Sequence, residues 1–398
     1  MIEITGNYNT AKCYASTLED GAREQIRTVC DMKEFAASKI RIMPDVHTGK
    51  GCTIGTTMTV TDKIVPAMVG VDIGCGMYTV ALGKVDIDLE KFDEAAHFIP
   101  SGREVWEGRG ERFDLTVLRC YRYLRDAKRL ERSLGTLGGG NHFIELQKST
   151  ALDGAGEPEG GAKVWLMIHS GSRNMGKRIE EHYHKIADRM CTRYRVALAD
   201  KDLAFLPIEE EAGHHYFTDM LFALRYAKEN RRRMMESMKE TLSEFAPEVN
   251  FLRTIDIHHN YAAFEEHFGK KVCVHRKGAT SAKLDEIGII PGSMGTASYI
   301  VRGLGNPESF MSCSHGAGRR MSRVAASMNL TVEECDKAME GIVCERWSKY
   351  TGYSRKAKGC LDLSEAPQAY KDIESVIDAE RDLIEPLVRL VPMASLKG

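Results

Sequence analysis

Two long stretches in the middle of the chain repeat apolar residues at helical spacing, with strand-like patterns before and after them. Residues 175–198 and 216–245 are the predicted long helices, and residues 17–39 form a shorter one. Residues 52–82 are rich in Thr, Val, Ile and Gly, which indicates short strands joined by tight turns. The pattern therefore predicts an α+β fold with strands towards both ends of the chain.

Shorter patterns predict the remaining elements. Further helices are expected over residues 89–98, 113–133 and 372–385, and strands or extended segments over 39–44, 163–169, 251–257, 271–277, 296–303 and 387–396. The Gly- and Glu-rich residues 149–161 are expected to form an exposed loop. Because no repeat, low-complexity tract or linker interrupts the pattern, we expect one domain over residues 1–398, built from stacked sheets.

Composition narrows the class of protein. Hydrophobic types make up 43% of the chain and charged types 28%, which is typical of a globular protein with a large core. The 55 Lys and Arg against 57 Asp and Glu exclude a histone-like binder but allow a local anion site. No apolar run reaches the roughly 20 residues that span a bilayer, and the N-terminus has no secretory pattern. Eleven cysteines without a Cys-x-x-Cys pair indicate reduced thiols, so we expect a cytoplasmic protein.

Five short segments place metal-binding or nucleophilic side chains at the ends of apolar runs. They are VDIGCGM with Asp72 and Cys75, GGGNHF with Asn141 and His142, IHSGSRN with His169, IDIHHNY with His258, His259 and Asn260, and SHGAGRR with His315. Strands would bring these side chains to a sheet edge, where glycine permits close backbone approach. Carboxylate, thiolate and imidazoles together suit Mn²⁺, Fe²⁺, Co²⁺ or Zn²⁺. The alternative is that each is an ordinary buried residue.

Three other polar features have two interpretations each. The glycines and arginines that follow His315 are typical of a phosphate-binding turn, where a histidine can act as acid, ligand or nucleophile, or they are a plain turn before a helix. His47, close to Asp45, is either a ligand or a turn cap. The basic run NRRRMMESMK at residues 230–239 is expected to be a solvated helix face, with contact to an RNA backbone as the alternative.

Taken together and in this order, the segments resemble the RtcB family of GTP-dependent RNA ligases. The resemblance runs from MPDVHTGKGCTIG through VGVDIGCGM, LGTLGGGNHFIE, IHSGSRN, HHNY, HRKGA, IPGSMGTASYIVRGLGN and SCSHGAGRRMSR to EAPQAYKDI and the terminal LKG. It covers essentially the whole chain. It implies a single RtcB-like catalytic domain in which stacked mixed β-sheets are surrounded by helices.

The resemblance also implies roles for matched residues. Cys75 would bridge two Mn²⁺ ions, with Asp72 and His142 completing one metal site and His169 and His259 the other. His315 would take GMP from GTP as a covalent phosphoramidate. The residues expected to bind the guanylate are Asn141, Glu145, Asn260, Ser293, Ser298, Tyr370 and Lys397, and Arg323 is expected to meet an RNA phosphate.

The implied reaction opens a 2′,3′-cyclic phosphate to a 3′-phosphate, transfers GMP to it, and joins the RNA-(3′)pp(5′)G end to a 5′-hydroxyl strand. It would serve tRNA splicing or RNA repair, with an archease-like activator as a candidate partner and a monomer as the default state. Gly139 and Ser364 depart from the common family pattern without removing an expected ligand. Two alternatives stay open: a two-metal phosphodiesterase or phosphatase acting on nucleic-acid ends, and a non-catalytic RNA-end binder.

Overall fold

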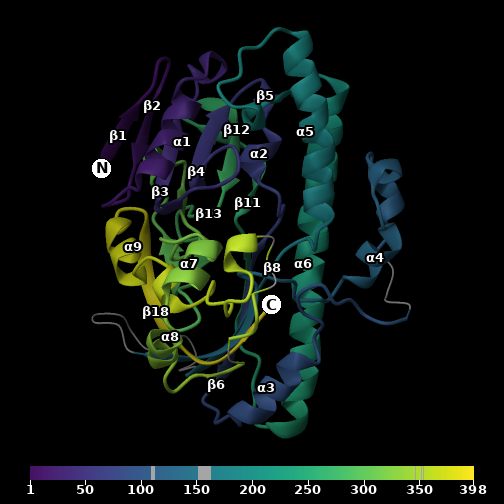
Figure 1. The fold of residues 1–398 in the computed structure, drawn as a ribbon, viewed down its shortest axis with the longest axis vertical. Coiled ribbons are helices and arrows are strands. Elements are labelled where there is room, and N and C mark those ends of the chain that lie inside the picture. Colours follow the sequence, from purple (N-terminus) through teal and green to yellow (C-terminus); the bar gives the residue numbers. More distant parts are fainter. Residues whose placement is uncertain (109–112, 151–162, 346, 351, 353) are drawn as a thin grey trace.

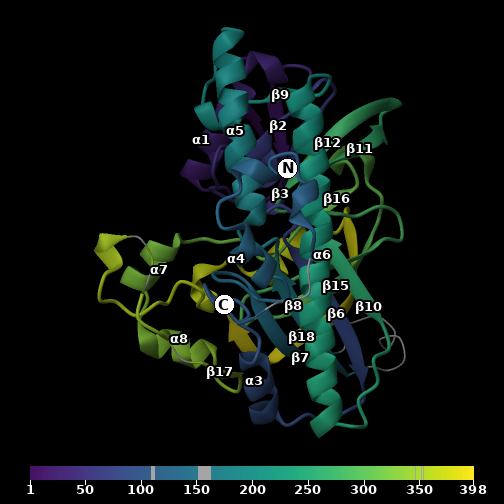
Figure 2. The same ribbon diagram turned by 90° about the vertical axis from the view of Figure 1, so that its right-hand side faces the viewer.

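The computed structural model describes residues 1–398 except 109–112, 151–162, 346, 351 and 353. Two large sheets lie one above the other along the long axis of the molecule, and two long helices run beside them (Figures 1 and 2). The α+β class predicted from the sequence is therefore confirmed. The loop expected at residues 149–161 lies largely outside the described residues.

The helices alternate with strands along the chain. The α-helices are α1 (Asp20–Cys30), α2 (Pro66–Val69), α3 (Leu89–His97), α4 (Ala127–Arg132), α5 (Met175–Arg193), α6 (Glu211–Phe245), α7 (Arg323–Asn329), α8 (Val332–Ala338) and α9 (Ile373–Ala379). Short 3₁₀ turns are η1 (Lys33–Phe35), η2 (Leu115–Val117), η3 (Tyr121–Tyr123), η5 (Lys201–Leu203), η6 (Pro307–Ser309), η7 (Arg355–Ala357) and η8 (Pro367–Ala369).

The strands form two large and two small sheets. The six-stranded sheet has the order β1 (Ile2–Thr5), β2 (Thr10–Cys13), β3 (Ile40–His47), β4 (Ile54–Val60), β12 (Lys270–Lys277) and β11 (Asn260–His267). The eight-stranded sheet has the order β10 (Thr254–His258), β6 (Gly76–Gly83), β8 (Val164–Ser170), β7 (Phe143–Thr150), β18 (Ile384–Lys397), β15 (Ser298–Gly303) and β14 (Ile287–Ile290), with β17 (Val343–Cys344) beside β18. The small sheets pair β13 (Ala279–Ser281) with β16 (Ser312–Ser314), and β5 (Lys63–Ile64) with β9 (Leu206–Pro207).

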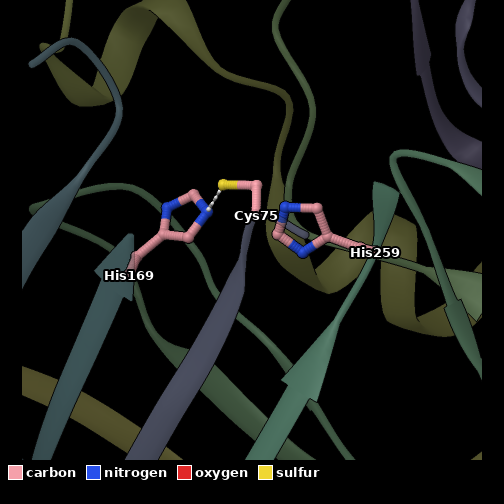
Figure 3. A group of neighbouring side chains, drawn as sticks. All are labelled: Cys75, His169 and His259. Atoms are coloured by element: carbon pink, nitrogen blue, oxygen red, sulfur yellow. Dashed lines mark hydrogen bonds between the residues drawn. The ribbon is translucent and has the colours of Figure 1, made fainter. Parts of the chain in front are cut away.

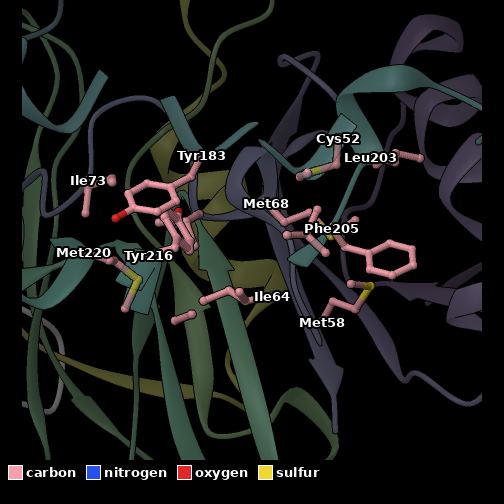
Figure 4. Close-up of a cluster of buried hydrophobic side chains, with 14 of the residues drawn as sticks. Cys52, Met58, Ile64, Met68, Ile73, Tyr183, Leu203, Phe205, Tyr216 and Met220 are labelled. Atoms are coloured by element: carbon pink, nitrogen blue, oxygen red, sulfur yellow. The ribbon is translucent and has the colours of Figure 1, made fainter. Parts of the chain in front are cut away.

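Both large sheets pack against the same long helix. The 35 residues of α6 span about 52 Å at 1.5 Å per residue, enough to pass both sheets. One apolar core joins the six-stranded sheet to α5 and the first half of α6, and Figure 4 shows Met58, Tyr183 and Tyr216 in it. A second core joins the eight-stranded sheet to α3 and the second half of α6, where Met234 and Met238 are buried. This shared helix fixes the position of one sheet relative to the other.

Several predicted boundaries were wrong for local reasons. The helix expected over residues 113–133 is reduced to turns and α4, because Asp126 takes a left-handed conformation (φ 60°) immediately before α4. The helix expected over 372–385 ends at Ala379, and β18 begins earlier than expected, at Ile384. A short helix, α2, interrupts the strands of residues 52–82. The sequence patterns also missed β1, β11 and β14, which are edge strands and bury only part of their side chains.

Candidate metal centre and active site

The antiparallel register of the eight-stranded sheet gathers the candidate ligands where neighbouring strands begin or end, on one side of the sheet. His169 near the end of β8 pairs with Met77 of β6 and with Phe143 of β7, so Cys75 and His142 lie just beyond it. The end of β10 pairs with Gly76, which places His259 on the same side. Because the chain passes at that point from β10 into β11 of the other sheet, the candidate site lies where the two large sheets meet.

Cys75 is shared by two sets of donor atoms. In the first set, ligand atoms of Cys75, His169 and His259 lie within 4.8 Å of one another. Figure 3 shows these three side chains gathered at the ends of neighbouring strands. In the second set, ligand atoms of Asp72, Cys75 and His142 lie equally close together. The Cys75 Sγ is 3.2 Å from His169 Nε2 and 3.5 Å from His142 Nε2, and Asp72 Oδ2 is 3.1 Å from His142 Nε2. The sequence predicted the same two sets, with Asp72 and His142 beside Cys75 in one and His169 and His259 beside Cys75 in the other.

Backbone carbonyls orient two of the imidazoles. His142 Nδ1 is 2.9 Å from the Leu137 carbonyl, and His169 Nδ1 is 3.0 Å from the Asn141 carbonyl. Since a carbonyl only accepts, each Nδ1 donates its proton. His169 Nε2 then faces the Cys75 sulfur, and His142 Nε2 lies between that sulfur and the Asp72 carboxylate. His259 Nδ1 is buried without a hydrogen-bond partner among the described residues. A buried polar atom without a partner is costly, which fits a site that a bound ligand completes.

The electrostatics of the cluster also fit cations. Burial raises the pKa of the Cys75 thiol well above its ordinary value, and the charge of Asp72 raises it further. Burial lowers the pKa of His169 and of His259, and neighbouring histidines add to the shift, so both rings are neutral at pH 7. Burial opposes ionisation of Asp72, but the hydrogen bond and charge of His142 outweigh it and bring its pKa to about 2. Neutral imidazoles, a carboxylate and a thiol that needs a nearby cation to ionise are a donor set for divalent metals.

Arg231 on α6 holds the backbone next to this cluster in place. Its Nη1 donates to the carbonyls of Gly74 (2.9 Å) and Ser170 (3.2 Å), and its Nε lies 2.8 Å from Asp256 Oδ1. The Arg231 residue is only 1% exposed. The prediction that residues 230–239 form a solvated face is therefore wrong at this position. The signal was in the sequence, because Arg231 shares a helix face with Met234 and Met238.

His315 faces the first donor set from the small β13–β16 sheet. Its ring centroid lies 4.8 Å from that of His259, and its side chain is 15% exposed. The fully buried Asp45 accepts through Oδ2 from the His315 backbone N–H (3.0 Å) and from Nδ1 (2.5 Å). Burial opposes ionisation of Asp45, but the charge and hydrogen bonds of His315 lower the pKa of the carboxyl overall. This arrangement leaves Nε2 as the ring nitrogen that can react.

A cavity of about 500 Å³ opens over these side chains. The predicted site residues that line it are Asp72, Cys75, Asn141, His169, His259, Asn260, His315, Arg323, Tyr370 and Lys397. Asn260 does more than line the wall: its Nδ2 donates to the Asp72 carbonyl (3.0 Å) and its Oδ1 accepts from Gly278 N–H (2.8 Å). His47 also lines the cavity, and its Nδ1 lies 2.9 Å from the Asp45 carbonyl, which favours the turn-cap interpretation.

One wall of the cavity is cationic and organised by a buried carboxylate. Glu365 accepts from Arg319 Nη1 and from Arg323 Nε, each at 3.2 Å, and from the Tyr370 hydroxyl. Burial opposes ionisation of Glu365, but the charges of Lys397, Arg323 and Arg319 lower its pKa overall. The Lys397 Nζ lies 4.7 Å from the centre of the Phe143 ring. The wall can bind anionic groups of a ligand.

Three predicted guanylate ligands do not line the cavity. Glu145 is buried, and its carboxylate accepts from the Ser395 hydroxyl (2.9 Å) and from Gln147 Nε2 (2.8 Å). Gln147 Nε2 also lies 3.2 Å from Ser298 Oγ. Ser293 Oγ pairs with the Thr296 hydroxyl at 2.9 Å within its own turn. The structure therefore places Glu145 and Ser298 in one buried polar network, and Ser293 in a local turn.

The order and spacing of these residues match a known family. The family model described as "tRNA-splicing ligase RtcB" matches residues 25–117 and 118–398. The chain belongs to this family. It is 37% identical to the RNA-splicing ligase RtcB of Escherichia coli strain K12, over 96% of this chain and 95% of that protein. It is 33% identical to the tRNA-splicing ligase RtcB of Archaeoglobus fulgidus, over 96% of this chain and 92% of that protein.

The family membership predicted from the motifs is thus confirmed. Asp45 had no predicted role, because its partner His315 lies 270 positions away in the sequence. Arg231 was predicted only as part of the basic run, either as a solvated face or as an RNA contact. Within the described part of the chain, no helix is long and apolar enough to cross a membrane.

Proposed function

We propose that this chain is an RNA ligase that joins a 3′-phosphate or 2′,3′-cyclic phosphate end to a 5′-hydroxyl end, using GTP and two Mn²⁺ ions. The observation that carries the proposal is the sharing of Cys75 between two donor sets, with the Asp45-held His315 facing one of them. A two-metal hydrolase does not need a histidine nucleophile, so the oriented imidazole favours ligation over hydrolysis. The names of the relatives agree with ligation of RNA.

In the proposed first step, His315 Nε2 attacks the α-phosphorus of GTP. The bond from Nε2 to phosphorus forms as the bond to the pyrophosphate oxygen breaks, which leaves GMP on the imidazole as a phosphoramidate. Nδ1 keeps its proton throughout, because it donates to Asp45 Oδ2 at 2.5 Å. The carboxylate also stabilises the positive charge that the ring gains on attack, a role known for histidine–aspartate pairs in general.

We propose that Cys75 would be a ligand shared by the two metals. Asp72 and His142 would complete one site, and His169 and His259 the other. When bound, two divalent cations neutralise phosphate charge and favour in-line displacement. Asn260 keeps the Asp72 and Gly278 backbones in place through its amide.

The guanylate is proposed to lie in the cavity between the cationic wall and the metal ligands. Asn141, Asn260, Tyr370 and Lys397 line that space. Glu145 and Ser298 would act from the buried network behind it, and Ser293 would shape the adjoining turn. We propose that Arg323, whose side chain is about half exposed, meets the RNA phosphate.

In the remaining steps, an oxygen of the RNA 3′-phosphate attacks the phosphorus of the His315-bound GMP, and the imidazole leaves. The 5′-hydroxyl of the second strand then attacks the 3′-phosphorus of the RNA-(3′)pp(5′)G end and releases GMP. Opening of a cyclic phosphate would come before these steps. The whole chain, residues 1–398, is proposed as one catalytic unit, since the site draws on residues from Asp45 to Lys397.

The cellular compartment and the biological context are also proposed. The eleven cysteines form no disulfide bonds, which supports a reducing compartment such as the cytoplasm. A monomer that works with an archease-like activator in tRNA splicing or RNA repair remains our proposal for its biological context.

The test is a joining assay with two labelled RNAs, one carrying a 3′-phosphate and the other a 5′-hydroxyl, in GTP and MnCl₂. The wild type should form a longer product that depends on both additions, and His315→Ala should form none. Release of phosphate without GTP, unchanged in His315→Ala, would overturn the proposal in favour of a phosphodiesterase or phosphatase. Tight binding of the RNA ends without any turnover would overturn it in favour of a non-catalytic binder.

A further inference from the structure

A strongly basic segment projects from the side of the molecule, outside the cavity. We call residues 119–132 the basic arm; it contains η3 and α4, and Figure 1 shows α4 beside α6, on the side away from the sheets. The arm has two acidic residues, Asp126 and Glu131, against six basic ones, namely Arg119, Arg122, Arg125, Lys128, Arg129 and Arg132. Since the whole chain is nearly neutral, this charge is a local feature.

The arm is attached to α6 through its backbone, so this attachment does not need the cationic side chains of the arm. The buried Asp219 of α6 accepts from the backbone N–H groups of Arg119 (2.8 Å) and Cys120 (3.0 Å). The Tyr226 hydroxyl donates to the Leu130 carbonyl at 2.6 Å. These bonds fix the position of the arm without using a charged side chain of the arm.

Three cations of the arm indicate that it binds an anionic partner. Arg122, Arg125 and Lys128 are exposed, and no carboxylate of the described residues forms an ion pair with them. Closely spaced like charges repel one another and disfavour the folded segment. A polyanion that runs along the arm would relieve this repulsion.

An exposed aromatic pair lies among these cations. The Tyr123 ring stacks on His182 of α5, with ring centroids 4.4 Å apart and an interplanar angle of 26°. Tyr123 is 68% exposed. Burial lowers the pKa of His182; the charge of Asp219 opposes this shift, and the charges of Arg189 and Lys185 on α5 add to it. Cations beside an exposed aromatic ring are the usual combination for single-stranded nucleic acid, whose phosphates and bases they contact separately.

Arginines connect the arm to the metal centre. Arg173, directly before α5, donates to Thr136 Oγ1 (2.8 Å) and to the Gly102 carbonyl (3.1 Å), and it interacts electrostatically with both Asp72 and Arg129. Arg129 in turn donates to the Arg103 carbonyl. Arg173 therefore lies near both the candidate metal ligand Asp72 and Arg129 of the arm.

We propose that the basic arm binds the backbone of a single-stranded RNA as it leaves the cavity, with a base stacked on Tyr123. This inference rests on the proposed function, which puts an RNA end at the metal centre, and adds where the rest of the strand lies. The arm contacts the strand only by charge and stacking, so it selects for length and single-stranded form and not for base sequence.

The test compares binding of a long single-stranded RNA with binding of a short one that occupies only the cavity. The arm variant is Arg122→Gln/Arg125→Gln/Lys128→Gln, and the matched control is Lys33→Gln/Lys91→Gln/Lys270→Gln, three exposed lysines on η1, α3 and β12. For the long RNA, the arm variant should lower the slope of log affinity against log salt by roughly 2 to 3, and the control should not. Tyr123→Ala should weaken binding about tenfold, and Tyr123→Phe should not.

Two results would overturn the inference. One is equal affinity and salt dependence of the arm variant and the wild type for the long RNA. The other is an equal loss for the short RNA, which would mean that the variant disturbs the cavity. Labelling with GTP in the absence of RNA separates this failure from failure of the proposed function. A wild type that takes up no GMP contradicts the ligase, whereas a wild type that ligates normally but binds RNA no better than the arm variant contradicts only the arm.

Discussion

Replacing Asp45 with Asn tests whether this carboxylate prepares His315 for attack. The Asp45 Oδ2 accepts two hydrogen bonds from His315, at 3.0 Å from the backbone N–H and 2.5 Å from Nδ1. An asparagine of the same size can keep one bond but loses the charge. A hydrogen bond to a charged group contributes about 1.5–3 kcal/mol. Since about 1.36 kcal/mol corresponds to tenfold in rate, we expect GMP transfer to His315 to slow by roughly 10- to 100-fold.

The assay is single-turnover labelling with α-labelled GTP at saturating Mn²⁺. Mn²⁺ affinity should stay unchanged in Asp45→Asn, because Asp45 belongs to neither donor set. Thermal unfolding of the variant shows whether any loss comes from unfolding. A folded variant that binds Mn²⁺ and labels at the wild-type rate would refute the argument that Asp45 orients the imidazole.

Three further predictions test other parts of the account. In a metal titration, Cys75→Ser should weaken the binding of both Mn²⁺ ions. The loss in affinity should exceed the roughly 10- to 100-fold that removal of a hydrogen-bond partner of a metal ligand costs. Loss of one ion only would contradict a sulfur shared by both sites. Arg231→Met should lower the free energy of unfolding in urea by about 3–5 kcal/mol, because it leaves the mostly buried Asp256 carboxylate with only the exposed Lys228, 3.8 Å away. Arg232→Met, which breaks a more exposed pair, should cost about 0–1 kcal/mol, and equal effects would contradict the supporting role. Burial raises the pKa of Glu380 to about 8, and Asp45 and Asp382 add to the shift. The neutral form of Glu380 therefore stabilises the fold most at a pH below the unfolded pKa of about 4.3, and this stabilisation is lost as the pH rises towards 8. Glu380→Gln should flatten the fall in melting temperature between pH 5 and pH 8. An unchanged profile would contradict the raised pKa.

Much of the candidate site could be predicted from the sequence because its signals are local. His142, His169 and His259 each lie at or next to the end of an apolar strand, within two residues of glycine or asparagine. The end of an apolar run can be read from the sequence without knowledge of the rest of the fold. The long helices could also be predicted, since their apolar periodicity extends over many turns.

The remaining features depend on contacts between distant residues. Asp45 and His315 are 270 positions apart, and only the packing of β3 against β16 brings them together. Arg231 and Arg232 are neighbours in one basic run, yet the first is buried under the metal centre and the second pairs with Glu229 at the surface. The helix pattern places Arg231 on the face of Met234 and Met238, but it does not show that this face of α6 packs on the eight-stranded sheet.

The central claim is that His315 carries GMP during the reaction. The most direct measurement is incubation of the purified protein with α-labelled GTP and MnCl₂, followed by denaturing electrophoresis. We predict a label that migrates with the protein, is lost in acid, persists in alkali and is missing from His315→Ala, as a phosphoramidate requires. A protein that holds Mn²⁺ but takes up no label, or a label that persists in His315→Ala, would contradict the claim.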